Sequence, residues 1–255
     1  MWMHPRAIGN RRSRNMLRYF FFDLDDTLTP SRTRMLPEHE GHFGALCERA
    51  EVIVVSGAEE NQMRAQIPDT FNGMYYLLTQ NGNHAVHKKG TELWSEGFSP
   101  EQKAIVGRFI DTIHDELALP VSDENDLVED RGSQISYSLI GHHEALEKKR
   151  AFDADGSKRK AILAAHPELV QNLEDAGVEV TVGGTTCFDI YLKGRNKGFN
   201  VKRLIDHLGW QHEHAIYIGD ALEPGRNDES VIGVIATKKV RDHHDTFFFI
   251  KSLLH

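Results

Sequence analysis

The chain has 255 residues, 40% hydrophobic and 27% charged, which is enough apolar material for one large domain or for a core with an inserted domain. Its formal net charge of −8 at pH 7 gives no overall attraction for nucleic acid or for anionic membranes. No apolar run of about 18 residues occurs, so we expect no membrane-spanning helix. The two cysteines, Cys47 and Cys187, form no disulfide framework, which favours a cytoplasmic protein.

The first 17 residues are basic and lack the apolar stretch of a secretory signal, so we expect a flexible extension there. A buried strand is predicted over the aromatic run Arg18–Leu24. The next segments are predicted as helix, strand, helix and strand, in this order: Pro37–Ala50, Glu51–Val55, Glu59–Gln66 and Tyr75–Leu78. Such alternation predicts a parallel sheet with helices on both faces.

The middle of the chain has a different pattern, in which short strand-like stretches mix with two long helical ones. The strand-like stretches are Ala85–His87, Thr91–Trp94, Gln134–Ile140, Val178–Val182 and Cys187–Ile190, and the helical ones are Glu101–Leu117 and Ser157–Ala176. This pattern predicts a separate α+β domain over residues 83–189. Turn-forming residues at Gln80–Gly82 and Gly194–Asn196 mark two crossings, so the domain is predicted to be an insertion.

The C-terminal part returns to the alternating pattern. It is predicted to contain the helix Gly198–Leu208, the strands Ala215–Ile218 and Gly233–Ala236, and the helix Asp242–Leu254. We therefore expect an α/β fold with a Rossmann-like parallel-sheet core, residues 1–82 and 190–255, and an inserted α+β domain, residues 83–189.

Three carboxylates follow the first predicted strand, in the sequence Asp23-Leu24-Asp25-Asp26-Thr27. Ligands of open parallel sheets bind at the carboxyl ends of the strands. Like charges at short range repel one another and raise each other's pKa, so a cation such as Mg²⁺ should offset the cost of this cluster. An exposed acidic turn or a helix cap would explain one aspartate but not three.

A second group of oxygen ligands, Asp220 with Asn227 and Asp228, follows the predicted strand Ala215–Ile218. Both groups are therefore expected at the same edge of the sheet. A hard divalent cation prefers oxygen ligands in an octahedral arrangement. We expect Asp23, Asp220 and one of Asn227 and Asp228 to share Mg²⁺.

Two further segments predict a phosphate site at this edge. Ser56 and Gly57 follow the strand Glu51–Val55 and supply a hydroxyl and approachable backbone N–H groups. Lys197 lies just before a predicted helix and can neutralise both a phosphate and the carboxylate that attacks it. The 15 histidines are scattered, and neither His142–His143 nor His243–His244 has a spacing that requires a metal site, so most are expected on the solvated surface.

In order along the chain, DLDDTLT from Asp23, then Ser56, Lys197 and GDALEPGRND from Gly219 resemble the four motifs of the haloacid dehalogenase superfamily of phosphatases and phosphomutases. The first and last motifs are specific, and the resemblance covers the whole sheet core. It implies Asp23 as a nucleophile that becomes phosphorylated and Asp25 as the general acid/base. The Mg²⁺ ligands that it implies are Asp23, the Asp25 carbonyl, Asp220 and one of Asn227 and Asp228.

The inserted domain is similar to the α/β cap shared by Cof-type sugar phosphatases and eukaryotic-type phosphomannomutases, and the similarity is closest to the latter. The stretches Arg131–Gly141 and Gly183–Asp189 follow their sugar-phosphate-binding segments. The substrate-binding residues expected from the motifs and from this resemblance are Ser56, Gly57, Arg131, His142 and Asp189. Phosphomannomutases of this type commonly pair through their caps, so the resemblance also implies a homodimer.

Three positions depart from the phosphomannomutase pattern. His142 stands where an arginine is usual, Cys187 where a serine is usual, and Pro120 about where another arginine is expected. Loss of arginine forks weakens bidentate phosphate recognition, and a mutase must hold a bisphosphate in two orientations. We therefore expect a Mg²⁺-dependent phosphatase acting on a small phosphorylated sugar, with a phosphomannomutase that interconverts hexose 1- and 6-phosphates as the alternative.

A non-catalytic phosphate-binding module is a further alternative. Such modules share strand-end carboxylates and Mg²⁺ but lack a residue equivalent to Asp25 and a large cap. Nucleic acid is not an expected partner, because the chain has no basic stripe.

Overall fold

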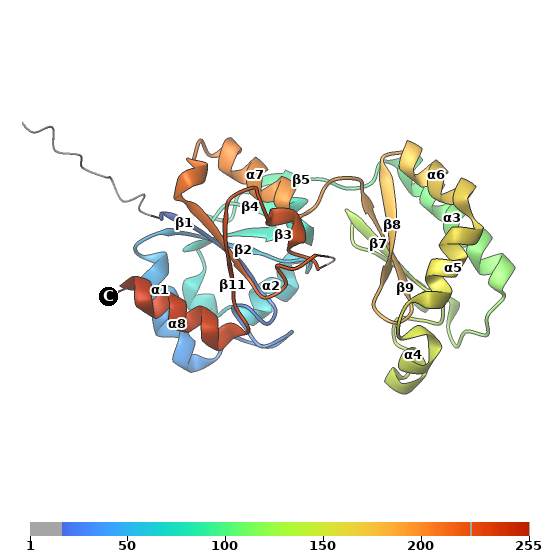
Figure 1. The fold of residues 1–255 in the computed structure, drawn as a ribbon, viewed down its shortest axis with the longest axis horizontal. Coiled ribbons are helices and arrows are strands. Elements are labelled where there is room, and N and C mark those ends of the chain that lie inside the picture. Colours follow the sequence, from blue (N-terminus) through green and yellow to red (C-terminus); the bar gives the residue numbers. More distant parts are fainter. Residues whose placement is uncertain (1–16, 225, 255) are drawn as a thin grey trace, which may run out of the picture.

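The computed structural model describes residues 17–224 and 226–254, so all but the last residue of the predicted basic extension lies outside the described residues. The described chain forms two lobes, each built on its own sheet (Figure 1). The larger lobe, called the core here, has a seven-stranded sheet, and the smaller, called the cap, has a four-stranded sheet. The expected α/β core with an inserted α+β cap is confirmed.

The core sheet has the order β11-β10-β1-β2-β3-β4-β5. Its strands are β1 (Tyr19–Asp23), β2 (Glu51–Val55), β3 (Tyr75–Thr79), β4 (His84–Val86), β5 (Glu92–Ser95), β10 (Ala215–Gly219) and β11 (Ala236–Lys239). All pairs from β11 to β3 are parallel, and β4 and β5 are antiparallel. The parallel strands β1, β2, β3 and β10 are buried on both faces, which explains why they are continuous apolar runs in the sequence, whereas the edge strand β11 is largely exposed.

Helices cover both faces of the core sheet (Figure 1). They are α1 (Pro37–Cys47), α2 (Glu60–Gln66), α7 (Lys197–His207) and α8 (His243–Leu254). Phe20 and Phe22 pack with α1, α2 and α8 on one face, while Phe21 packs with α7 on the other. This division follows from the strand period of two, which sends successive side chains of β1 to opposite faces.

The cap sheet is antiparallel with the order β6-β7-β9-β8. Its elements are α3 (Pro100–Leu117), β6 (Val128–Asp130), β7 (Gln134–Ser138), α4 (Leu146–Asp153), α5 (Ser157–Ala165), α6 (Pro167–Asp175), β8 (Val178–Gly183) and β9 (Cys187–Leu192). The helices lie on the side of the cap sheet that faces away from the core (Figure 1). No helix among the described residues has the length and apolar character needed to cross a membrane.

The predicted helix Ser157–Ala176 is in fact two helices, α5 and α6, which meet at His166. Pro167 is the cause, because proline disfavours helical backbone in the residue before it and begins a new helix easily. The sequence pattern therefore identified the helical character of the segment but missed the break.

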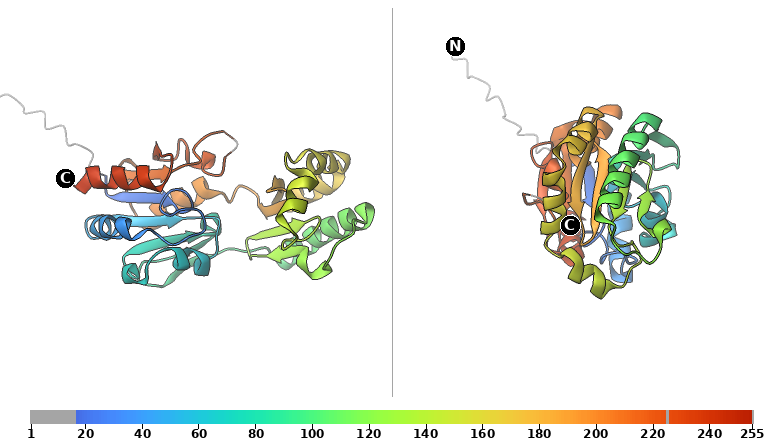
Figure 2. Two further views of the ribbon diagram at one scale, coloured as in Figure 1. Left: turned by 90° about the horizontal axis from the view of Figure 1, so that it is seen from below. Right: turned by 90° about the vertical axis from the view of Figure 1, so that its right-hand side faces the viewer.

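The chain leaves the core later than the sequence predicts. Residues 84–95 were expected in the inserted domain, yet β4 and β5 pair with β3 and extend the core sheet. Trp94 fixes them there by donating its indole N–H to the Gly82 carbonyl at 2.9 Å. The first crossing therefore follows β5 near Glu96, and the predicted boundary at residue 83 moves to this point. Figure 2 shows the two connections between the lobes.

Candidate active site

The carboxyl ends of the central parallel strands meet at one edge of the core sheet. The register pairs Asp23 of β1 with Val55 of β2, so Asp23 lies beside Ser56. On the other side Phe22 pairs with Ile218, which brings Asp220 to the same edge. The three segments that the sequence analysis selected separately are thus brought together by strand pairing alone.

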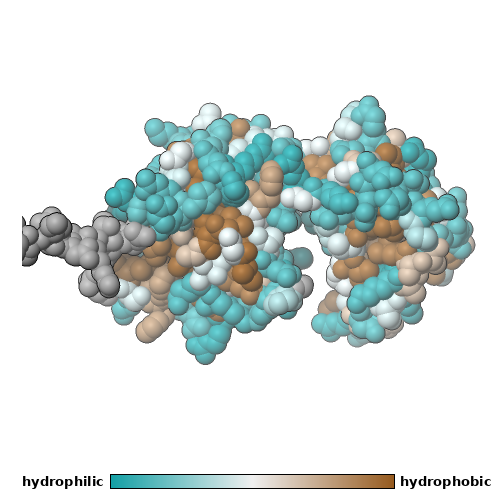
Figure 3. Space-filling view, turned by 45° about the horizontal axis from the view of Figure 1, so that its top comes forward, coloured by the Kyte–Doolittle hydropathy of each residue, from teal (hydrophilic) through white to brown (hydrophobic). Residues whose placement is uncertain are grey.

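A cleft of about 1490 Å³ lies between this edge and the open face of the cap sheet, and the space between the two lobes is visible in Figure 3. The predicted site residues that line it are Asp23, Asp25, Ser56, Gly57, Arg131, Asp189, Lys197, Asp220 and Asn227. His142 and Asp228 are not among the described residues that line the cleft. Asp228 lies just beneath the cleft floor, whereas His142 lies in the cap.

Lys197 is a buried cation on the cleft floor. Its side chain is 1% exposed, and its Nζ donates to Asp23 Oδ1 at 2.6 Å and to Asp228 Oδ1 at 2.7 Å. Burial disfavours the charge on Lys197, but attraction by the two carboxylates outweighs burial and raises its pKa. Burial also raises the pKa of Asp23 to about 7, in spite of the opposing effect of Lys197. The ammonium is therefore charged and close enough to Asp23 to stabilise a negative phosphoryl group on it.

The acidic loop that follows β1 lines the cleft with Asp25 and Asp26 and is held in place by hydrogen bonds. Asp25 Oδ1 accepts a hydrogen bond from the Arg32 backbone N–H at 2.5 Å. Asp26 adopts a positive φ of 58°, a conformation that aspartate tolerates better than most residues. The fully buried Thr27 hydroxyl accepts from the Asp220 N–H at 3.1 Å. Thr27 thus ties the first acidic segment to the second.

The carboxylates of Asp23, Asp220 and Asp228 can each place one oxygen within 4.8 Å of the others. Burial, followed by the charge of Asp228, raises the pKa of Asp220. Asp228 Oδ2 is buried and has no hydrogen-bond partner among the described residues. A Cβ on Gly219 would approach this oxygen to 2.3 Å, so only glycine leaves it room. Converging oxygens, one of them unpaired, are the donor set that suits Mg²⁺.

Ser56 and Gly57 form a tight turn after β2. Ser56 is 4% exposed, and its Oγ accepts from the Ala58 N–H at 3.1 Å. A Cβ on Gly57 would meet Asn81 Oδ1 at 3.4 Å, so the small residue allows the loop after β3 to approach closely. Both residues line the cleft beside Asp23, as a phosphate-binding turn would.

The cap wall of the cleft carries Arg131 and Asp189. Arg131 pairs with Glu129 through both Nε and Nη2, and Asp189 Oδ1 accepts from the Ser136 hydroxyl at 2.8 Å. Both contacts run across the sheet surface that faces the core, and Arg131 and Asp189 themselves line the cleft. Their hydrogen bonds within the cap orient both side chains, and their polar atoms at the cleft surface can contact a sugar or a phosphate.

His142 does not itself line the cleft but lies directly behind Glu129, which does, with 3.7 Å between His142 Nδ1 and Glu129 Oε1. Its side chain is 10% exposed, its Nε2 is 3.1 Å from the Ser136 carbonyl, and its Nδ1 is 4.0 Å from Cys187 Sγ. The contact with Cys187 raises the pKa of His142. Burial raises the pKa of the Cys187 thiol, but the hydrogen bonds from His142 and Thr186 outweigh burial and lower that pKa. The substrate-binding role predicted for His142 therefore stays a prediction, because its ring is engaged by Ser136 and Cys187.

Several site residues gave no signal in the sequence. The buried Tyr217 hydroxyl donates to Asp228 Oδ1 at 2.8 Å, and its position in an apolar strand suggested packing alone. Gln80 Oε1 accepts from the Ser133 hydroxyl at 2.6 Å and so joins core to cap. Glu96 pairs with Arg195 at 3.4 Å, which ties the two connections together. Each contact joins residues that only the fold brings together.

Comparisons with known proteins agree with this geometry. The family model of eukaryotic phosphomannomutase matches residues 40–255. The phosphomannomutase of Drosophila melanogaster is 25% identical over 217 residues, covering 82% of this chain and 84% of that protein. The phosphomannomutase of Glycine max is 27% identical over 221 residues, covering 82% of this chain and 84% of that protein.

Solved structures share the fold at lower identity. A phosphatase of the haloalkanoate dehalogenase superfamily from Bacteroides thetaiotaomicron has a TM-score of 0.61 at 12% identity, covering 97% of this chain and 99% of that one. The IMP-nucleotidase of Plasmodium falciparum has a TM-score of 0.66 at 15% identity, covering 94% of this chain and 69% of that one. These solved structures share the fold of this chain. The family match goes beyond the fold and shows that the chain is an enzyme of the haloacid dehalogenase superfamily and belongs to the eukaryotic phosphomannomutase family.

Proposed function

We propose that this protein moves a phosphoryl group between O1 and O6 of a hexose through an aspartyl-phosphate at Asp23. The observation that carries the proposal is one cleft with a cation on each wall, Lys197 on the core side and Arg131 on the cap side. A hexose bisphosphate has a phosphate at each end and needs two such positions. The family match and the relatives named phosphomannomutase support this alternative over the phosphatase that was first expected.

In the proposed reaction the enzyme starts with a phosphorylated Asp23. The hexose 1-phosphate attacks this phosphoryl group with O6, while Asp25 accepts the O6 proton, and a hexose 1,6-bisphosphate forms. After the bisphosphate reverses its orientation, Asp23 attacks the phosphorus on O1, and Asp25 returns the proton to O1. Hexose 6-phosphate leaves, and Asp23 is phosphorylated again.

The remaining residues position the group and neutralise its charge, which is most of what phosphoryl transfer requires. Lys197 would contact both Asp23 and the phosphoryl oxygens, and Ser56 with the N–H groups of its turn would bind the others. Asp23, the Asp25 carbonyl, Asp220 and one of Asn227 and Asp228 would hold Mg²⁺, which supplies further charge neutralisation when bound. Arg131 would bind the phosphate that does not react, and Asp189 a sugar hydroxyl.

Phosphatase activity is a second candidate, favoured by the position of His142. An arginine there would offer a charged fork to the distant phosphate, whereas His142 is buried and engaged by Ser136 and Cys187. Weak binding of the hexose phosphate that should accept the phosphoryl group would leave the phosphorylated Asp23 open to attack by water. The net reaction would then be hydrolysis of the sugar phosphate.

The test follows two products in the same tubes. The protein is incubated with Mg²⁺ and mannose 1-phosphate, with and without a catalytic amount of glucose 1,6-bisphosphate. Mannose 6-phosphate that appears only with the bisphosphate supports the mutase. Free phosphate without isomerisation would refute the mutase and favour hydrolysis. The variant Asp23→Asn is the control, and its activity should fall by about 10⁴-fold or more while the fold is retained.

We also retain the proposal that two copies pair through their caps in the cytoplasm. Val128 on the edge strand β6 is 42% exposed and Leu146 at the start of α4 is 59% exposed, so apolar side chains are available on the cap surface. Light scattering coupled to size exclusion would give the mass in solution, and the variant Leu146→Glu should reduce it if α4 takes part.

A further inference from the structure

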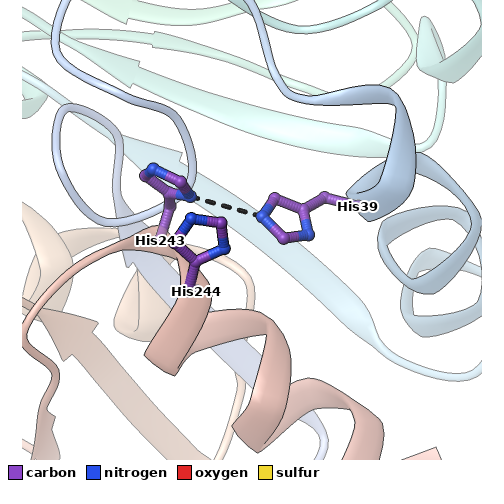
Figure 4. Close-up of side chains that lie close together, drawn as sticks. All are labelled: His39, His243 and His244. Carbon is purple, nitrogen blue, oxygen red and sulfur yellow. Dashed lines mark hydrogen bonds between the residues drawn. The ribbon is translucent and has the colours of Figure 1, made fainter.

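Three histidines meet at the junction of α1 and α8, outside the cleft residues described above. His39 lies in the first turn of α1, and His243 and His244 begin α8, more than 200 residues later in the chain. Figure 4 shows the three rings grouped between the two helices. His39 is 6% exposed, His243 is half-buried and His244 is exposed. The group thus reaches from the protein interior to solvent.

The spacing of the ring nitrogens suits a metal ion. Each histidine can place one nitrogen within 4.8 Å of the other two, and His39 Nε2 lies 3.3 Å from His243 Nδ1. Zn²⁺ lies about 2.0–2.1 Å from its histidine ligands in tetrahedral sites. Two such ligands are about 3.4 Å apart, by the geometry of a tetrahedron with those bond lengths. This pair, which is joined by a hydrogen bond in the structure, already has about this separation.

These histidines differ from others in the described part of the chain. His84, His114, His166 and His212 each lie within 4 Å of a carboxylate oxygen, whereas no such ion pair with the three clustered histidines is formed among the described residues. Burial lowers the pKa of His39 and of His243, and the neighbouring histidines lower both further. Neutral imidazole is the form that binds metals.

The ring of His39 is held in place before any ion binds. It stacks on Phe247, with centroids 4.1 Å apart and an angle of 7° between the planes. The rings of His243 and His244 are fixed to the same helix as Phe247 and lie 4.1 Å apart. Such preorganisation lowers the conformational cost of binding an ion.

We propose that His39, His243 and His244 form a binding site for a divalent transition-metal ion of the Zn²⁺ type, which joins the start of α8 to α1. Three nitrogen donors favour Zn²⁺, Co²⁺ or Ni²⁺, whereas the oxygen donors of the cleft favour Mg²⁺. The exposed position of His244 leaves a fourth coordination position open to water. The two sites would therefore hold different metals in one protein.

Co²⁺ is the probe, because tetrahedral Co²⁺ absorbs visible light far more strongly than octahedral Co²⁺. The full-length protein is stripped with a chelator, saturated with Mg²⁺ to occupy the cleft, and titrated with CoCl₂. We expect an intense visible band that saturates at about one equivalent. The double variant His243→Gln/His244→Gln should bind Co²⁺ about 100-fold more weakly or worse, because even the loss of an outer-shell partner costs 10- to 100-fold.

Two matched variants make the test specific. His212→Gln removes a histidine that pairs with Asp206 outside the cluster and should leave the band unchanged. His244→Gln alone removes an exposed ligand, so weakened binding in this variant cannot come from a failure to fold. No intense band in the wild type, or a band that survives in the double variant, would overturn the proposal.

A second measurement uses Zn²⁺ and thermal unfolding. Zn²⁺ at about 100 times its dissociation constant should raise the melting temperature of the wild type by roughly 5–10 °C. The double variant should show no such rise, while His212→Gln should respond like the wild type. A wild-type melting temperature that does not change with Zn²⁺ would overturn the idea that the ion joins α8 to α1.

Discussion

Replacing Lys197 with methionine isolates the contribution of the buried cation on the cleft floor. Methionine keeps most of the side-chain volume and removes the ammonium that Asp23 and Asp228 share at 2.6 and 2.7 Å. Breaking a buried ion pair by removing one partner costs about 3–5 kcal/mol, because the other partner keeps its desolvation cost. For a protein of this size the loss corresponds to a fall in melting temperature of about 6–20 °C.

The loss should depend on pH in a defined direction. The folded-state pKa of Asp23 is about 7, above the ordinary value of 3.8, so Asp23 takes up a proton on folding and its contribution to stability falls as pH rises through 7. Lys197 lowers the pKa of Asp23, so this pKa should be higher still in the variant. Above pH 7 the variant then continues to lose stability through Asp23, whereas the wild type does not. The difference in unfolding free energy between wild type and variant should therefore grow above pH 7, by up to about 1.4 kcal/mol per pH unit.

Urea unfolding in EDTA, followed by tryptophan fluorescence at pH 6 and pH 8, measures this difference. Trp94 and Trp210 both pack in the core, so their emission follows the lobe that contains Lys197. The matched control is Lys202→Met on the same helix, which removes an exposed pair with Asp206 and should change stability by less than about 0.5 kcal/mol. A loss below about 1 kcal/mol, or an equal loss at both pH values, would refute the reasoning.

Three further variants address catalysis, specificity and cap movement. Asp25→Asn should slow turnover by about 10²- to 10⁴-fold and cause phosphoenzyme to accumulate in quench experiments; an unchanged steady-state rate would exclude Asp25 as the acid/base. His142→Arg should lower the KM for the sugar phosphate by about tenfold, because a charged fork would replace an engaged imidazole; an unchanged KM would place the distant phosphate elsewhere. Glu96→Gln should increase proteolysis at the connections, with a stability change below about 1 kcal/mol; a cleavage rate equal to that of wild type would contradict its role as a tie.

The central strands of the core could be predicted well from the sequence because they are buried on both faces. Apolar runs such as Phe20–Phe22 and Val52–Val55 are typical of strands in the interior of a parallel sheet. The polar segments that follow such strands meet at one sheet edge by the geometry of parallel pairing. The proximity of Asp23, Ser56 and Asp220 follows from that geometry. No knowledge of side-chain contacts was needed.

The cap and the helix junction were harder because their contacts join distant parts of the chain. The short strands β4 and β5 carry no signal that tells which sheet they extend. His142, in the loop after β7, contacts Cys187 of β9 at 4.0 Å, and only the fold brings these two residues together. His39 and His243 belong to one cluster only because α1 and α8 pack together, and neither local sequence has a metal-binding spacing.

The tie between Glu96 and Arg195 has a consequence for how the lobes can move. A lobe attached by one strand can swing, twist and slide, whereas two attachments that are joined to each other leave chiefly rotation about the line through both. The cap face would then travel on an arc, and Arg131 would approach and leave the cleft floor along one path. In the proposed mutase reaction, the bisphosphate would reverse its orientation at the wide end of this arc, where the cap no longer holds it.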